Sequence, residues 1–523
     1  MSIENKGKEE IKRWETIPEM ATEMPILSFE ESEKKIEIFE DKIHEDDLFP
    51  EYTHGKSLTD EEGFCLNKYK TDLERYNREK TCVVIPQGIR VIKAEAFYGC
   101  IGIKVIVIPA SVGSIESNAF KDCEALLLCN HKDKPRAWDE GWNCGLDYRF
   151  DIESQIKKAN KDIDDGNYEN SIPLIKELAE RGYYIAQNML GCCYAKGEGV
   201  KEDKKRAFEW CKKATEQDYA VAQYNLAGCY YNGEGVKEDK KQAVEWCKKA
   251  AEQDYAAAQN NLAVCYAKGE GVKKDKKQAF DWFEKAAEQG IAKAQYNLAM
   301  CYYNGEGVKE DKKQAFDWYK KAAKQGIAKA QYNLALCYAK GDGVEEDKKQ
   351  AFDWFEKAAK QGDAKAQYNL ALCYDYGAGV EKDKKQAFDW FEKAAEQGDA
   401  KAQNNLAVRY AKGEGVKKDK KQAFEWFEKA AEQGIAEAQN NLAVCYAKGE
   451  GVKKDKKQAF EWFEKAAKQG MAAAQYNLAL CYYKRKEYDE AQSWLEKALA
   501  DGVSEAQKYI DKINKKLRRL KVS

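Results

Sequence analysis

The side chains best suited to chemistry are scarce in this sequence or are poorly placed for a catalytic site. The three histidines are His44, His54 and His131, and none has neighbours at the spacing of a metal-ligand set. No serine or cysteine has a nearby histidine to serve as its base. The recurring Gly-Glu-Gly-Val stretch is read as a hairpin turn, because it does not follow a strand and open a helix bearing Lys-Ser or Lys-Thr. We therefore expect no enzyme activity, no catalytic residues, no cofactor and no metal.

Cysteine is common, with 17 residues, but its placement argues against disulfides. The sequence contains a unit that recurs every 36 residues, and one position of this unit, just before an inward Tyr, holds Cys in most copies and Arg409 in one. Stacked copies would lie further apart than the Cα separation that a disulfide allows. We interpret these cysteines as small apolar packing residues in a reducing compartment, which predicts a cytoplasmic protein. The cysteines at this position are Cys229, Cys265, Cys301, Cys337, Cys373, Cys445 and Cys481.

Basic, amide and aromatic side chains recur together and form the second candidate group. An Asn precedes the core Leu in eight copies, and in four of these a Lys stands four residues earlier, on the same helical face. The pairs are Lys293 with Asn297, Lys329 with Asn333, Lys365 with Asn369, and Lys401 with Asn405. The position just before the Asn alternates between Tyr and Asn, and holds Tyr296, Tyr332 and Tyr368 in three of these copies.

Each of these recurring side chains also has a purely structural interpretation. A repeated Asn could hydrogen-bond the adjacent helix and satisfy a buried polar group. The Lys could be solvated, and the variation between Tyr and Asn is expected of a recognition surface but also of neutral drift. The sequence leaves both interpretations open.

The elements that position these residues are set by a repeat of 36 residues. The period is marked by Trp210, Trp246, Trp282, Trp318, Trp354, Trp390, Trp426 and Trp462. In one copy, Ala222, Leu226, Ala227 and Tyr230 form the apolar stripe of a first helix, which Gly233 and Gly235 end. Asp239 is expected to cap a second helix, whose inner stripe is Ala243, Trp246, Ala250 and Ala251.

A single copy of this hairpin is too small to fold alone. About six large side chains contribute roughly 1.5–3 kcal/mol each on burial. Ordering each of 36 backbone units costs roughly 1–2 kcal/mol. Stacking of the copies is therefore obligatory, as in other solenoid proteins.

The pattern A-x-x-x-L-A-x-x-Y-x-x-G-x-G-V … D-x-x-x-A-x-x-W-x-x-x-A-A resembles the Sel1-like repeat, a relative of the tetratricopeptide repeat, from about residue 160 to 515. The resemblance implies a right-handed α-α superhelical solenoid. It also implies that the Lys and Asn positions line the concave surface, where they can bind a peptide carboxylate. Secreted Sel1-like proteins pair cysteines between the end of one unit and the start of the next. That pairing is absent here, which counts against export and against the penicillin-binding activity of that subfamily.

A shorter repeat of 23 residues precedes the solenoid. Pro86, Ile92, Phe97 and Cys100 match Pro109, Ile115, Phe120 and Cys123. Alternating aliphatic residues predict strands, and each Ala-Phe pair predicts an inward wedge. The V-I-P … I-x-x-x-A-F-x-x-C skeleton resembles the leucine-rich repeat of the BspA type and implies a small β-rich module.

The charge composition indicates which classes of partner to expect. The 88 basic and 90 acidic residues leave a net charge of −2, so we expect neither nucleic acid nor a membrane as partner. We predict three parts: an acidic segment over 1–80 that is partly disordered or an adaptor, leucine-rich repeats over 81–150, and a mainly α solenoid over 151–523. The favoured function is a cytoplasmic scaffold, monomeric or weakly self-associating, that binds an acidic or carboxylate-ended peptide of another protein. The alternatives are a secreted-type hydrolase with penicillin-binding activity and a self-associating structural protein.

Overall fold

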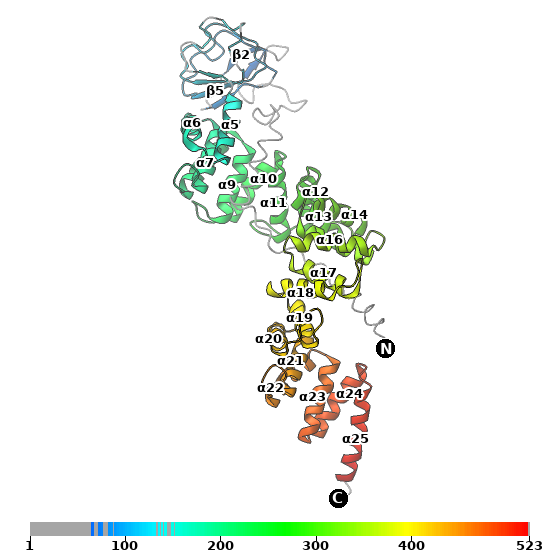
Figure 1. Cartoon of the computed structure of the whole chain (residues 1–523). Coiled ribbons are helices and arrows are strands. Elements are labelled where there is room, and N and C mark those ends of the chain that lie inside the picture. The colour runs from blue at the N-terminus through cyan, green and yellow to red at the C-terminus, as the bar shows by residue number, and fades with distance from the viewer. Residues whose placement is uncertain are drawn as a thin grey trace. The chain divides into compact units, whose positions relative to one another are not determined.

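The computed structural model describes residues 64–66, 72–76, 82–86, 88–131, 134–135, 137–139, 141–143, 148–150 and 152–520 (Figure 1). Most of the acidic segment expected over 1–80 therefore lies outside the described residues. The chain divides into two units, and the division falls within one helix. The N-terminal unit runs to Ala294 and includes Glu306–Val308. The C-terminal unit comprises Gln295–Gly305 and the chain from Lys309 onward.

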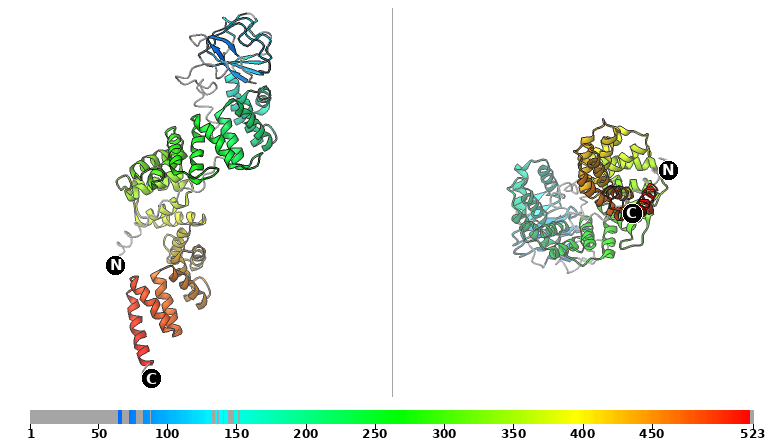
Figure 2. Two further views of the ribbon diagram at one scale, coloured as in Figure 1. Left: turned by 180° about the vertical axis from the view of Figure 1, so that it is seen from behind. Right: turned by 90° about the horizontal axis from the view of Figure 1, so that it is seen from below.

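The N-terminal unit begins with two four-stranded sheets. Their strands form the blue region of Figure 2. All strand pairs are parallel except β1 with β2. One sheet has the order β1(Phe64–Leu66), β2(Asp72–Tyr76), β4(Val91–Ile92) and β6(Ser114–Ile115). The other has the order β3(Cys82–Val84), β5(Val105–Ile108), β7(Leu126–Cys129) and β8(Tyr148–Phe150). Strands β1 and β2 precede residue 81, where the sequence places the start of this module.

The repeat of 23 residues sets the register of these sheets. Cys82 lies opposite Val105 and Val91 opposite Ser114, so each pair is displaced by one repeat. Phe97 and Phe120 are fully buried, and their ring centroids lie 5.3 Å apart. The predicted inward wedges are confirmed.

Helices follow without further strands in the described residues. Three of them flank the repeated hairpins: α5(Ile152–Asp164), α6(Tyr168–Glu180) and α25(Glu505–Leu520). The first helices of the hairpins, called A helices below, are α7(Tyr184–Lys196), α9(Ala220–Asn232), α11(Ala256–Lys268), α13(Ala292–Asn304), α15(Ala328–Lys340), α17(Ala364–Tyr376), α19(Ala400–Lys412), α21(Ala436–Lys448) and α23(Ala472–Arg485). The second helices, called B helices, are α8(Lys204–Ala214), α10(Lys240–Glu252), α12(Lys276–Glu288), α14(Lys312–Lys324), α16(Lys348–Lys360), α18(Lys384–Glu396), α20(Lys420–Glu432), α22(Lys456–Lys468) and α24(Tyr488–Ala500), with a 3₁₀ turn η2(Thr215–Gln217) after α8.

The ends of each hairpin helix follow from local sequence. Helix α15 ends at Gly341, which takes the left-handed conformation at φ 73°. Helix α16 begins after Asp347, whose side chain accepts hydrogen bonds from the backbone N–H groups of Lys349 and Gln350. These are the caps that the repeated Gly and Asp predict.

The large ring at the centre of each hairpin is not the one that the sequence predicts. Trp246 was expected in the inner stripe of its B helix, but it is only half-buried, with the Lys249 Nζ atom 4.0 Å from the centre of the Trp246 ring. The residue after the Trp is buried instead, as Cys247 here and as Phe355 after Trp354. The Trp lies at the edge of the stripe, where its ring covers the hairpin core and contacts a Lys at its outer face.

Candidate functional site

The four predicted Lys residues occupy the first turns of successive A helices. Lys329 and Lys365 are exposed, whereas Lys293 and Lys401 are half-buried. In the C-terminal unit, Lys329, Lys365 and Lys401 hold equivalent places on α15, α17 and α19. Apart from Lys329, the side chains of α15 are buried or half-buried. A partner reaching this helix would therefore meet the Lys first.

The predicted Asn residues face the neighbouring repeat. Asn333 and Asn369 are buried, and Asn297 and Asn405 are half-buried. The Asn405 Nδ2 atom donates to the Tyr368 hydroxyl at 3.4 Å and that of Asn333 to Met300 Sδ at 3.7 Å, both in the preceding A helix. The Asn369 Nδ2 atom donates to the carbonyl oxygen of Lys365 in its own helix at 2.9 Å. The geometry thus favours the structural interpretation of the Asn, which satisfies its amide within the array and, at Asn333 and Asn405, joins an A helix to the one before it.

The alternation between Tyr and Asn has the same explanation. Where Asn replaces Tyr, its amide oxygen becomes the acceptor: Asn441 donates to Asn404 at 3.3 Å and Asn477 to Asn440 at 3.0 Å. In the N-terminal unit Asn225 likewise donates to Asn188 at 2.9 Å. Both residue types supply an acceptor oxygen, so the bond between repeats tolerates either.

The predicted Tyr side chains are mostly inaccessible. Tyr296 and Tyr332 are buried and Tyr368 is half-buried. Burial raises the pKa of Tyr296 to about 12 and that of Tyr332 further, while the Asn of the next repeat acts in the opposite direction. The Tyr332 ring packs on Phe355 with ring centroids 5.9 Å apart. A ligand would reach little more than the half-buried Tyr368.

Two carboxylates beside the Lys positions were missed by sequence reasoning. Asp363 and Asp399 cap α17 and α19, where they accept hydrogen bonds from Ala366 N at 2.8 Å and Ala402 N at 2.7 Å. Burial raises the pKa of Asp363, although its cap bond, Lys365 and Lys329 act in the opposite direction. The signal was available, because other repeats carry Ile, Met or Tyr at this position.

The stripe predicted to be basic and amide-lined is therefore a row of mixed charge. We define the A-helix row as Lys329, Asp363, Lys365, Asp399 and Lys401. In this row Lys329 and Lys365 are exposed, whereas Lys401 and both carboxylates are half-buried. Binding of a peptide by the predicted residues stays a prediction.

The sequence profile of the Sel1 repeat matches nine consecutive segments of the chain, namely residues 185–219, 220–255, 256–291, 292–327, 328–363, 364–399, 400–435, 436–471 and 472–503. The chain belongs to the Sel1 repeat family. A second profile, BspA type Leucine rich repeat region (6 copies), matches residues 76–137, which hold the paired sheets.

Solved structures of other Sel1 repeat proteins resemble this one. The crystal structure of c5321, a protective antigen of uropathogenic Escherichia coli strains, is 40% identical with a TM-score of 0.62, over 65% of this chain and 73% of that one. A Sel1 repeat protein from Oxalobacter formigenes is 34% identical with a TM-score of 0.46, over 58% of this chain and 88% of that one. A search of curated proteins found no match.

The cysteines of the Sel1 repeats are buried or half-buried free thiols. Burial raises the pKa of Cys337 to about 12 and that of Cys445 to about 11. Deprotonation is therefore disfavoured, and these side chains act as small apolar groups in the core.

Neither a metal site nor a membrane-spanning helix is found in the described ranges. No three or more His, Cys, Asp or Glu side chains there are arranged to hold a metal ion. None of the helices from α5 to α25 is both long enough and apolar enough to cross a bilayer.

Proposed function

We propose that this Sel1 repeat protein is a non-enzymatic cytoplasmic scaffold that binds a peptide segment of another protein along the A-helix row. Stacked helical repeats present extended surfaces that suit such binding. The observation that carries the proposal is the recurrence of an accessible cation, Lys329 and then Lys365, on otherwise covered helices.

The charges of the row indicate which peptide fits. The ammonium groups of Lys329 and Lys365 are exposed, whereas Asp363 and Asp399 are half-buried and use a carboxylate oxygen in their caps. A bound segment would therefore meet the cations more directly than the carboxylates. An acidic segment, or one that ends in a free carboxylate, is the expected partner.

The test is quantitative affinity capture from the native host with the full chain. Reversing Lys329, Lys365 and Lys401 to Glu should remove at least one partner that the wild type retains, and its retention should fall with added salt. The matched control reverses Lys349, Lys385 and Lys421, which are exposed in the first turns of three B helices. Equal recovery of every partner by both variants and the wild type would show that the row does not bind them.

A further inference from the structure

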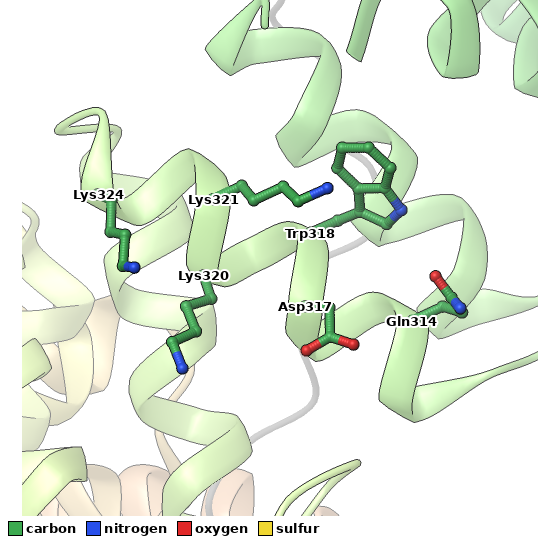
Figure 3. A pocket seen from close by; sticks show the side chains of 6 residues that line it. All are labelled: Gln314, Asp317, Trp318, Lys320, Lys321 and Lys324. Atoms are coloured by element: carbon green, nitrogen blue, oxygen red, sulfur yellow. The ribbon is translucent and has the colours of Figure 1, made fainter. Parts of the chain in front are cut away.

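A hollow on the outer face of α14 combines one aromatic ring with three cations. Its volume is about 340 Å³, it is partly open to solvent, and its described lining comes from this one helix. Trp318 is half-buried, and the other described lining residues, Gln314, Asp317, Lys320, Lys321 and Lys324, are exposed. Figure 3 shows Lys321 extending toward the Trp318 ring, whereas Lys320 and Lys324 lie together on the other side of Lys321 and point away from that ring.

The two cations on that side distinguish α14 from every other described B helix. Lys320 and Lys324 are separated by one turn, so that two like charges are adjacent. The same positions form ion pairs in α16, where Glu356 and Lys360 are 2.9 Å apart, and in α22. At least one of the two positions holds Glu in α10, α12, α18, α20 and α24, and after α8 the second position is Glu216 of η2.

The fold of α14 does not neutralise this pair. Among the described residues, neither Lys320 nor Lys324 has a carboxylate within ion-pair distance, and Asp317 is the one acidic residue of the described lining. The Lys321 Nζ atom lies 3.5 Å from the centre of the Trp318 ring. Helices α12, α18 and α20 also carry like charges at these two positions, but as two Glu, so α14 differs from them in the sign of the pair.

We propose that an acidic peptide segment of a partner protein crosses the exposed surface of α14, with an apolar side chain at the Trp318 edge of the hollow and carboxylates against Lys320 and Lys324 at the opposite edge. Charge complementarity identifies the partner, because the lining carries three cations and one anion. The Trp ring offers the apolar surface that a simple anion site lacks. This site is separate from the A-helix row, so either proposal can fail alone.

The experiment measures fluorescence anisotropy of a labelled Glu-Glu-Phe-Glu-Glu peptide titrated with the full chain. We expect saturable binding that salt weakens, and weaker binding when Gln replaces each Glu of the peptide. Lys320→Glu should reduce the affinity about tenfold or more, because it juxtaposes like charges. The substitution reproduces the Glu and Lys pattern of α16, so it leaves the helix folded.

Lys360→Glu is the matched control, with the same change of charge on the neighbouring B helix. An equal loss of affinity in Lys360→Glu, absence of saturable binding, or equal competition by inorganic sulfate would overturn the proposal. It would also be overturned by sedimentation showing a wild-type dimer that Lys320→Glu dissociates, since a second copy would then occupy the face. The proposal would also be overturned if the peptide bound only after the acidic residues of 28–51 were changed to amides, since a segment of the chain itself would then be the occupant.

Discussion

Gly343 shows how the contact between repeats depends on the absence of a side chain. It has φ +73°, and a Cβ atom there would lie 2.1 Å from the carbonyl oxygen of Lys312 in the preceding repeat. Equivalent contacts recur along the chain, as between Gly379 and Lys348 at 2.0 Å. The second glycine of the Gly-Glu-Gly-Val turn is thus fixed by packing as well as by backbone conformation.

Gly343→Ala should lower the free energy of unfolding by about 2–5 kcal/mol, because strain of about 1–2 kcal/mol adds to overpacking of about 1–3 kcal/mol. Gly362→Ala is the control, since Gly362 has φ +93° but nothing within 4 Å of its Cβ position. Gly362→Ala should lower the free energy of unfolding only by the strain contribution of about 1–2 kcal/mol. Urea unfolding followed by circular dichroism measures both, and equal losses would show that the close contact is unimportant.

Arg409 and Asp375 form a buried ion pair between neighbouring repeats. The Arg409 Nη2 atom lies 2.7 Å from Asp375 Oδ2, and Lys384 Nζ lies 2.6 Å from Asp375 Oδ1. The Arg409 side chain is 4% exposed and that of Asp375 9%. Arg409 occupies a position that holds Cys in other repeats, and Asp375 occupies one that holds Tyr or Ala. Each of the two unusual charges is therefore neutralised by the other.

Asp375→Ala leaves Arg409 buried without its counterion and should destabilise the region by about 3–5 kcal/mol. Arg409→Cys should cost less, because Lys384 still pairs with Asp375. The double change should restore much of the stability, because apolar packing replaces the pair. Hydrogen exchange of the α17 and α19 amides measures these changes. Additive losses in the double variant would contradict the expected coupling.

The A helices explain where sequence reasoning succeeded and where it could not. The Gly and Asp caps, the small-residue stripes and the Cys positions follow from local chemistry, and the structure has them. The placement of Asn333 and Tyr332 does not, because α15 packs on both preceding and following helices and polar residues lie inside. Because polar side chains of this helix are buried together with the apolar ones, its sequence has no distinct polar face from which the accessible side could be predicted. The prediction that Trp246 lies in the inner stripe was wrong for a related reason, since a large ring at the edge of a stripe recurs with the same spacing as one at its centre.

The caps of α17 and α19 give these two helices a dependence on pH. The pKa of Asp363 is raised in the folded protein, so the protonated form is favoured by folding. The stability gained from protonation of Asp363 is fully present below the pKa of this carboxyl in the unfolded chain, and it is lost as pH rises through its pKa in the folded protein.

Asp363→Asn keeps a capping oxygen and removes the charge. It should therefore be more stable than the wild type at neutral pH and similar to it at acidic pH below the unfolded pKa of Asp. Hydrogen exchange of the first turn of α17 at both pH values measures the difference. A stability difference independent of pH would show that the charge of Asp363 is not the cause.

The molecule as a whole depends on contacts between successive hairpins. Within the C-terminal unit, B helices contact the next A helix, and Gln361, at the end of α16, donates to Gln331 of the same repeat at 2.7 Å. The same Gln331 donates to the carbonyl oxygen of Ala323 at 3.1 Å. One amide thus joins three consecutive helices, and similar bonds recur in the other repeats.

Deletion of residues 328–363, one whole repeat, should leave a folded protein whose mean helical content per residue is unchanged, because the new neighbours present near-identical surfaces. Deletion of 346–363 removes only α16 and its flanking turns, and should expose the apolar side of α15. Circular dichroism and size-exclusion chromatography distinguish the two products. Equal helicity and equal solubility of both would contradict the hairpin as the unit of stability.

The buried pair of Asp375 and Arg409 also limits how this array can change in evolution. Duplication or loss of whole repeats elsewhere joins surfaces of the common type. A crossover that separates the segment carrying Asp375 from the segment carrying Arg409 would strand one charge in an apolar interior. These two repeats must therefore be inherited together, as a linked couple within a series of otherwise exchangeable copies.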